Sequence, residues 1–167
     1  LIEQRLNQLS PSALRLARLA ALAGQNFSVD LAARVLGRHA LDIADDWREL
    51  EAALVIRDDA FAHDLIFEAT LRSVPEAIAR LMQGDIARVL AARGAPPARL
   101  AAHWFAAGEW AQAGVAFAEA ARHAGRASRR AEEAELWGRA VSSHEQAGDR
   151  SAAFEARRCS VDAVMAS

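Results

Sequence analysis

One short stretch, residues 54–62, carries the only clear β-strand signal in a chain of 167 residues. Apolar and β-branched residues stand on both sides of Asp58-Asp59, a pattern that is typical of a tight hairpin. Asp64 follows, and its carboxylate can cap a helix that opens at residue 65. The stretch therefore predicts a hairpin that leads directly into a helix, with His63 at the junction.

Three helices are predicted ahead of this hairpin, after residues 1–9, which we expect to be the end of a helix that starts outside the sequence. The first runs from the start signal Ser10-Pro11 to Gly24, because a capping hydroxyl and a following Pro favour helix initiation. The second is expected between Ser28 and Gly37, and the third from a cap at Asp42. The apolar stripe predicted for the third helix comprises Ile43, Trp47, Leu50 and Leu54.

Three helices, a hairpin and a capped helix are the element order of a winged-helix domain, which we predict for residues 1–74. In winged helices that bind DNA, the third helix enters the major groove. Here the positions expected to be exposed on that helix are mostly acidic: Asp42, Asp45, Asp46, Glu49 and Glu51. Arg48 is the one basic residue among them. Because phosphate contacts supply much of the affinity for DNA, this helix is a poor candidate for a DNA-reading element.

Residues 75–167 are predicted to form a helical array. Ser73-Val74-Pro75-Glu76 has the pattern of a capping box, and the helix that it would open ends near Gly94. After the linker Ala95-Pro96-Pro97, the breaks at Gly108 and at Gly148-Asp149 divide the remainder. The expected helices are 98–107, 109–125, 130–147 and a last one from residue 150 onward.

Two of these segments match each other at an offset of about 20 residues. Ala111, Gly114, Phe117 and Ala120 correspond to Ala131, Ala134, Trp137 and Ala140. Small residues beside one large aromatic ring allow antiparallel helices to pack closely, as in tetratricopeptide (TPR) hairpins. The predicted fold is therefore mainly α: a winged-helix-like domain with one short hairpin, followed by a TPR-like antiparallel array. One irregular helical bundle is the alternative for the second part.

The composition points away from enzymes and membranes. All 20 basic residues are Arg, so a phosphate-binding loop that ends in Lys cannot be present, and the net charge is -2. One Cys, Cys159, forms no disulfide within the chain and suits a reducing cytoplasmic compartment. No apolar run is long enough to cross a membrane. The five His residues have neither metal-site nor catalytic spacing: His39, His63, His103, His123 and His144. We therefore expect no catalytic residues, no metal site and a regulatory or interaction module.

Residues 61–69, Phe-Ala-His-Asp-Leu-Ile-Phe-Glu-Ala, resemble the Phe-x-His-Asp-Leu-Ile-x-Glu-Ala segment of the STAND-type signalling ATPases. The resemblance is strongest to the large bacterial ATP-binding regulators, many of which end in a LuxR-type DNA-binding domain. Residues 16–27 are similar to the start of the family's winged helix. The similarity continues through Pro75 and residues 95–104, where the family passes into TPR-like helices.

The resemblance implies a nucleotide switch. In that family an upstream ATPase core, absent from this chain, holds the nucleotide, and the winged helix docks on the core. His63 would then contact the phosphates of bound ADP in the complete protein, with Asp64 as its neighbour. Ala62 and Phe67 depart from the family, which often has Met or Arg before the His and commonly Arg at the second position. The alternative for His63 is a histidine at a strand end that bonds to nearby backbone.

The resulting hypothesis is a non-catalytic regulatory fragment of a STAND-like, ATP-dependent transcriptional regulator. Because the chain opens at Leu1 rather than Met, we expect it to be cut from a longer protein. It holds no cofactor itself, and ATP or ADP is implied for the complete protein. The implied partners are the ATPase core, and a protein or small-molecule inducer at the helical arm. DNA would be bound only through a domain outside this chain. The alternatives are a DNA-binding winged helix with a helical dimerisation arm, or a free-standing TPR-like scaffold.

Overall fold

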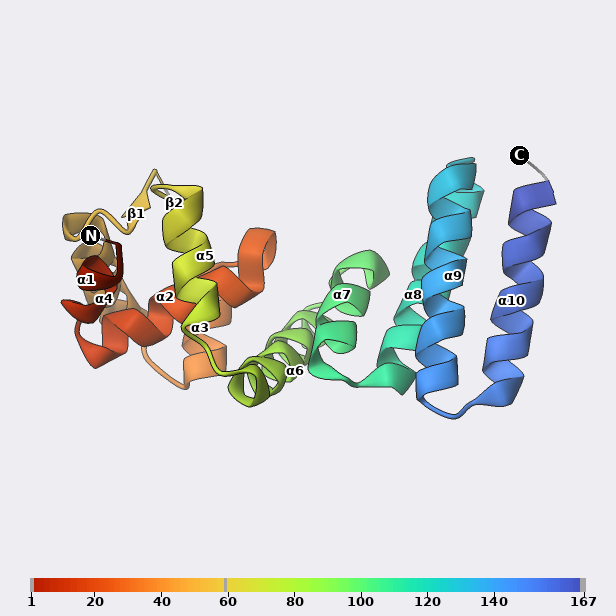
Figure 1. The fold of residues 1–167 in the computed structure, drawn as a ribbon, viewed down its shortest axis with the longest axis horizontal. Helices are drawn as coiled ribbons and strands as arrows, with labels where there is room; N and C mark the ends of the chain where they lie inside the picture. Colours follow the sequence, from red (N-terminus) through yellow and green to blue (C-terminus); the bar gives the residue numbers. More distant parts are fainter. Residues whose placement is uncertain (1, 59, 166–167) are drawn as a thin grey trace. The chain divides into compact units, whose positions relative to one another are not determined.

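The computed structural model describes residues 2–58 and 60–165, which are mainly helical with one two-stranded antiparallel sheet (Figure 1). The chain divides into two compact units, Leu1–Val89 and Leu90–Ser167. This division falls within helix α6 (Glu76–Ala92), later in the chain than the predicted boundary at 74/75. The first part of α6 lies with unit 1, where the side-chain amide of Gln83 donates to the carbonyl oxygen of Leu22 at 3.2 Å.

Unit 1 is built around helix α2, which packs against α4 and α5. Small and branched apolar side chains fill its core, and the fully buried ones include Leu16, Leu19, Leu31, Ile43, Leu50 and Val55. Besides the start of α6, its elements are α1 (Ile2–Asn7), α2 (Pro11–Ala23), the 3-10 turn η1 (Gly24–Asn26), α3 (Val29–Leu36), α4 (Ala40–Ala52), β1 (Ile56–Arg57), β2 (Ala60–Phe61) and α5 (Asp64–Arg72).

The predicted ends of the first two helices are confirmed. The hydroxyl of Ser10 accepts from the backbone N–H of Ala13 at 3.2 Å, with Pro11 in the first turn. The hydroxyl of Ser28 accepts from the N–H of Leu31 at 3.1 Å. Gly37 ends α3 at φ 62°, a left-handed conformation that Gly adopts without steric cost.

The third helix differs from the prediction at both ends. It begins at Ala40 with His39 as its cap, so Asp42 lies inside the helix. Leu54 was expected in the buried stripe but is 45% exposed, and its φ of 55° belongs to the turn that follows α4. Val55 takes the buried place instead. Because α4 ends before residue 54, the helical spacing no longer applies there, and the next buried apolar side chain comes one residue later than predicted.

The predicted hairpin is present but shorter than expected. Its two strands pair in antiparallel register, with Ile56 opposite Phe61 and Arg57 opposite Ala60. Asp58, in the turn, has a φ of 51°, which Asp tolerates better than most residues. Asp59 lies outside the described residues.

The predicted capping box at residues 73–76 is wrong. Ser73 instead ends α5, where its hydroxyl donates to the carbonyl oxygen of Thr70 at 2.7 Å and accepts from Nε of Arg18 at 3.0 Å. With its hydroxyl engaged there, Ser73 does not serve α6, which begins at Glu76. A contact between residues 55 positions apart in the chain thus overrides a purely local pattern.

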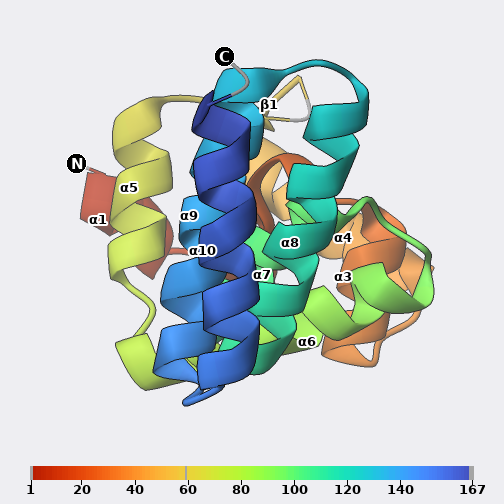
Figure 2. The ribbon, with the colours of Figure 1, turned by 90° about the vertical axis from the view of Figure 1, so that its right-hand side faces the viewer.

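Unit 2 follows the predicted helices closely, with ends within two residues of those expected. They are α7 (Pro97–Ala107), α8 (Trp110–Arg126), α9 (Arg130–Gln146) and α10 (Arg150–Met165), and each packs against the next (Figure 1, Figure 2). The core consists of Ala side chains around the rings of Phe117 and Trp137. In the matched segments Gly114, Phe117, Ala120, Trp137 and Ala140 are buried, whereas Ala111 and Ala131 are exposed.

Candidate functional site

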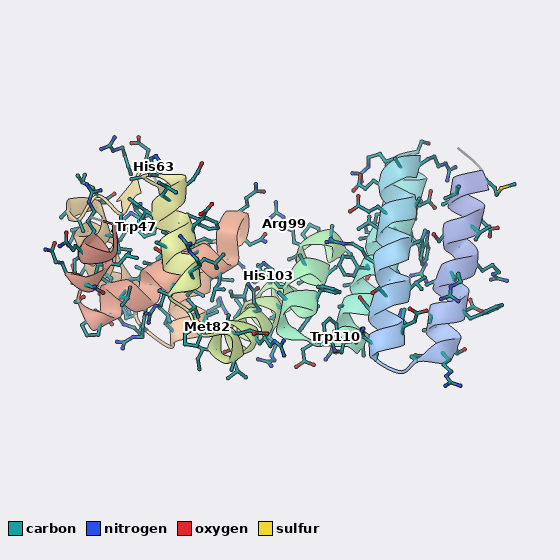
Figure 3. All side chains as sticks on the ribbon, viewed as in Figure 1. Trp47, His63, Met82, Arg99, His103 and Trp110 are labelled. Carbon is teal, nitrogen blue, oxygen red and sulfur yellow. The ribbon has the colours of Figure 1, made fainter. Side chains whose placement is uncertain are left out.

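The sequence-predicted site residue, His63, lies at the junction between β2 and α5 (Figure 3). Its backbone is extended, and Nδ1 of its ring accepts a hydrogen bond from the backbone N–H of Leu65 at 3.1 Å. Since Nδ1 acts as the acceptor, this hydrogen bond assigns the ring proton to Nε2. The side chain is exposed, and no described residue accepts a hydrogen bond from Nε2. His63 can therefore offer an N–H donor to a group outside unit 1.

Asp64 is not the cap that the sequence predicts. The helix begins at Asp64 itself, and the imidazole of His63 occupies the capping role. The carboxylate of Asp64 is exposed in the first turn, where it complements the positive end of the helix dipole. The prediction failed because His is a rarer cap than Asp, and the local pattern favours the commoner one.

The hairpin packs against the first turn of α5 at this junction. The N–H of Ala62 donates to the carbonyl oxygen of Val55 at 3.0 Å, which closes the base of the hairpin. The rings of Phe61 and Phe67 meet edge to face, with centroids 5.4 Å apart and planes at 73°. Phe67, which stands where the resembling family commonly has Arg, thus has a packing role here. These contacts hold the residues on both sides of His63 in place.

A second histidine cap has the same form. Nδ1 of His39 accepts from the N–H of Leu41 at 3.3 Å, and the His39 ring is also exposed. Histidine capping in this protein is therefore a property of helix starts and not of one site. What distinguishes His63 is its place directly after the hairpin. The sequence reading missed both caps, although each His stands two residues before the Leu whose N–H it accepts.

Two carboxylates of α4 face inward, contrary to the expectation that they are exposed. Asp46 is 6% exposed; its Oδ1 accepts from the hydroxyl of Ser12 at 2.7 Å, and its Oδ2 pairs with the guanidinium of Arg38. The half-buried Glu49 accepts from the backbone N–H of Ser10 at 2.5 Å and from its hydroxyl at 2.6 Å. These carboxylates fasten the first turn of α2 and the turn before α4 to the middle of α4.

The surface of α4 keeps part of its predicted acidic character. Asp42, Asp45 and Glu51 are exposed. Arg48 forms an ion pair with Asp45 at 2.7 Å, with both side chains 74% exposed. The single basic side chain of this helix is thus matched by an acid of the same helix.

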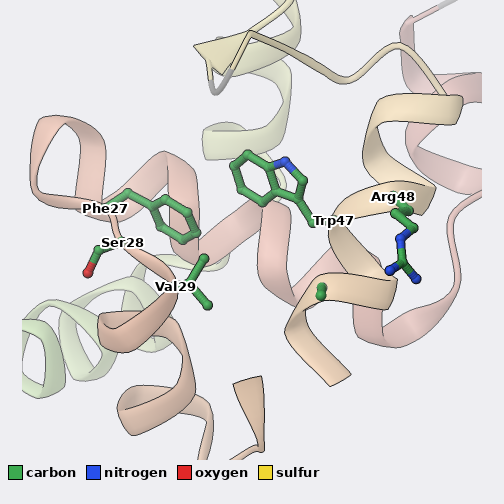
Figure 4. Close-up of a pocket in the computed structure, with 6 residues that line it drawn as sticks. Phe27, Ser28, Val29, Trp47 and Arg48 are labelled. Carbon is green, nitrogen blue, oxygen red and sulfur yellow. The ribbon is translucent and has the colours of Figure 1, made fainter. Parts of the chain in front are cut away.

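A pocket of about 550 Å³ opens beside α4 (Figure 4). The rings of Phe27 and Trp47 stack within it, with centroids 5.5 Å apart and planes at 13°. Val29, 46% exposed, and the rings of Phe27 and Trp47 point toward one another in the close-up (Figure 4). Ser28, Ala44 and Arg48 complete the lining. This aromatic surface can receive an apolar or planar group.

The remaining candidate groups are packed within unit 2 or dispersed. His103 and His144 are buried, and burial lowers the pKa of His103. Cys159 is half-buried. The described residues contain no cluster of three or more His, Cys, Asp or Glu placed to hold a metal ion. Within 2–58 and 60–165, no helix has both the length and the apolar character needed to cross a membrane.

Comparisons with protein-family models, with curated proteins and with solved structures found no match for this chain. The function is therefore argued from the geometry at His63 and from the arrangement of the two units' own elements.

Proposed function

We propose that this chain is the non-catalytic regulatory part of a STAND-like, ATP-dependent transcriptional regulator. In this proposal the winged-helix-like residues 1–74 relay the nucleotide state of an ATPase core to a TPR-like arm formed by residues 75–167. The observation that carries the proposal is the exposed ring of His63, held by its Nδ1 bond to the N–H of Leu65 with Nε2 directed away from that bond.

An imidazole held in this way suits an anionic phosphate oxygen, because its Nε2–H is left to donate a hydrogen bond. The cap fixes the ring, so little side-chain freedom is lost when a phosphate is bound. The neighbouring carboxylate of Asp64 opposes an anion at the same helix start. We therefore expect His63 to contribute to ADP binding only together with a core that supplies most of the affinity.

The proposed switch needs two states that bind nucleotide differently. ADP would favour a closed arrangement through His63, and inducer with ATP would favour an open one. The outer side of α10 supports a role in partner binding for the arm. Its exposed apolar side chains are Phe154, Val161, Val164 and Met165, with exposed fractions of 57–83%. Apolar side chains gathered on one exposed helix are typical of surfaces that bind another protein element.

The test uses the complete regulator, encoded by the full reading frame, with a transcriptional reporter. His63→Ala and His63→Asn should both raise basal activity without inducer. The Asn side chain can restore the cap through Oδ1, but it is too short to place a donor where Nε2 lies. A coupling of about 1–3 kcal/mol corresponds to a change of about 5- to 150-fold in the equilibrium between the states.

His39→Asn is the matched control, because it alters the same kind of cap at another helix start. It should leave basal activity unchanged. Basal activity that stays at the wild-type level in both His63 variants, with both proteins folded, would refute the nucleotide role of His63. A reading frame with no phosphate-binding loop upstream of Leu1 would refute the proposal as a whole.

A further inference from the structure

A second hollow in unit 1, of about 460 Å³, lies among α1, α2 and α5. Its polar lining consists of Asn7, Arg18, Arg72 and Ser73, and its apolar lining includes Leu6 and Leu14. None of the described side chains that line it is acidic. The hollow thus combines two guanidinium groups with a small apolar wall.

Arg18 is held in place at the edge of this hollow. Its side chain is half-buried, and its Nε donates to the hydroxyl of Ser73 at 3.0 Å. That hydroxyl is itself fixed, since it donates to the carbonyl oxygen of Thr70 at 2.7 Å. The two terminal nitrogens of Arg18 have no acidic partner among the described residues. They can therefore form the paired hydrogen bonds that a guanidinium makes with a phosphate.

Arg72 adds a second positive charge from the last turn of α5. Its guanidinium has no ion pair and no hydrogen bond among the residues that the structure describes, whereas five other arginines of unit 1 are paired with acids: Arg34, Arg38, Arg48, Arg80 and Arg88. The backbone carbonyl oxygens next to Arg72 already accept hydrogen bonds from other groups. Those of Ala69, Thr70 and Leu71 all accept hydrogen bonds from residues 73 and 74.

We propose that this hollow binds the phosphate group of a small phosphomonoester, with Arg18 and Arg72 on the phosphate oxygens. The volume exceeds that of a phosphate alone and lies in the range of small-molecule sites, so the apolar wall is available to the rest of the ligand. His63 caps the start of α5, whereas Arg72 lies in its last turn, about 13 Å further along the helix axis. The site is therefore separate from His63, and the inference stands independently of the proposed function.

The test is calorimetric titration of the 167-residue chain with ribose 5-phosphate, beside ribose and inorganic phosphate. We expect ribose 5-phosphate to bind more tightly than inorganic phosphate, ribose not to bind, and the affinity to fall with added salt. Arg72→Gln should weaken binding at least about tenfold, since it removes one of the two charges. Arg18→Lys should also weaken binding at least about tenfold, because an ammonium group keeps the positive charge but cannot form the two parallel hydrogen bonds of a guanidinium. Arg72 is exposed and unpaired, so its variant should fold normally.

Arg15→Gln is the matched control: it removes one positive charge from α2, at an exposed residue outside the hollow. Its affinity should equal that of the wild type. An equal loss in Arg15→Gln would show diffuse charge attraction and overturn the proposal. So would the absence of binding at about 10 mM ribose 5-phosphate. Binding to phosphatidic acid vesicles without binding of ribose 5-phosphate would also overturn it, in favour of a lipid surface.

Discussion

A Cβ atom added to Gly114 would lie 2.6 Å from Cε1 of His144, so the imidazole ring rests directly on the backbone of α8. Two further ring atoms, Nδ1 and Nε2, would lie 2.7 and 2.9 Å away. His144, from α9, is buried, and its contact with Gly114 is part of the packing between α8 and α9. The missing side chain of Gly114 is what admits this ring.

Gly114→Ala should therefore destabilise unit 2 by about 1–3 kcal/mol, the usual cost of forcing an extra methyl group into a packed interface. Urea unfolding followed by circular dichroism gives the value. Gly138→Ala is the matched control in α9, because nothing lies within 4 Å of its added Cβ. That change should stabilise the protein by about 0.5–1 kcal/mol, since Ala is the better helix former. A Gly114→Ala protein as stable as the wild type would mean that the His144 ring moves aside without cost.

Asp46 is expected to be the carboxylate whose loss costs most on α4. Asp46→Ala removes the acceptor of the Ser12 hydroxyl and leaves Arg38, whose side chain is only 26% exposed, without its acid. Breaking such a pair should cost about 3 kcal/mol. Asp45→Ala breaks the fully solvated pair with Arg48 and should change the free energy of unfolding by less than about 1 kcal/mol. Equal effects in the two variants would contradict the structural role of Asp46.

Stability should fall in acid because of His103. The residue is 6% exposed, and burial lowers its pKa below the ordinary value of 6.5. Below about pH 6.5 the unfolded chain takes up a proton at His103 that the folded protein does not, so the free energy of unfolding decreases as the pH falls. Well above pH 6.5 His103 is neutral in both states, so it no longer makes the free energy of unfolding depend on pH.

The measurement is the urea midpoint between about pH 7.5 and about pH 5.5 for the wild type and for His103→Gln. The variant cannot titrate at this position, so its stability should decline less steeply with acid. His123→Gln, at an exposed histidine of the neighbouring helix α8, is the control and should follow the wild-type curve. Parallel curves for the wild type and His103→Gln would show that His103 does not contribute to the acid dependence.

The limits of α2 and α3 were predictable because the signals that set them are local. Ser10 and Ser28 accept from N–H groups three residues ahead, and Gly24 and Gly37 end helices through their own backbone freedom. The same holds for unit 2, where short breaks separate strongly helical runs. The hairpin was predictable for the same reason, since its strands are neighbours in sequence.

The burial of the two inward-facing carboxylates of α4 could not be predicted from local sequence signals. Asp46 and Glu49 bind residues 34 and 39 positions earlier in the chain, and the sequence around them is typical of an exposed acidic helix face. Ser73 is the same case, since its partner Arg18 lies 55 positions away. For the candidate site, the position of His63 was predicted, and so was its possible bond to nearby backbone. Its role as the cap of α5 was not, because Asp64 presented the commoner capping residue.

The cap gives His63 a thermodynamic role that can be measured apart from signalling. His63→Ala leaves the N–H of Leu65 without its acceptor, at a cost of about 1 kcal/mol, or about 2–4 °C in the thermal midpoint. His63→Asn should recover most of this loss, because Asn is among the best capping residues. The pair His39→Ala and His39→Asn should show the same pattern at α4, where Leu41 supplies the N–H. Scanning calorimetry on the four variants decides the matter: an Asn variant no more stable than its Ala counterpart at either position would show that the imidazole does not act as a cap there.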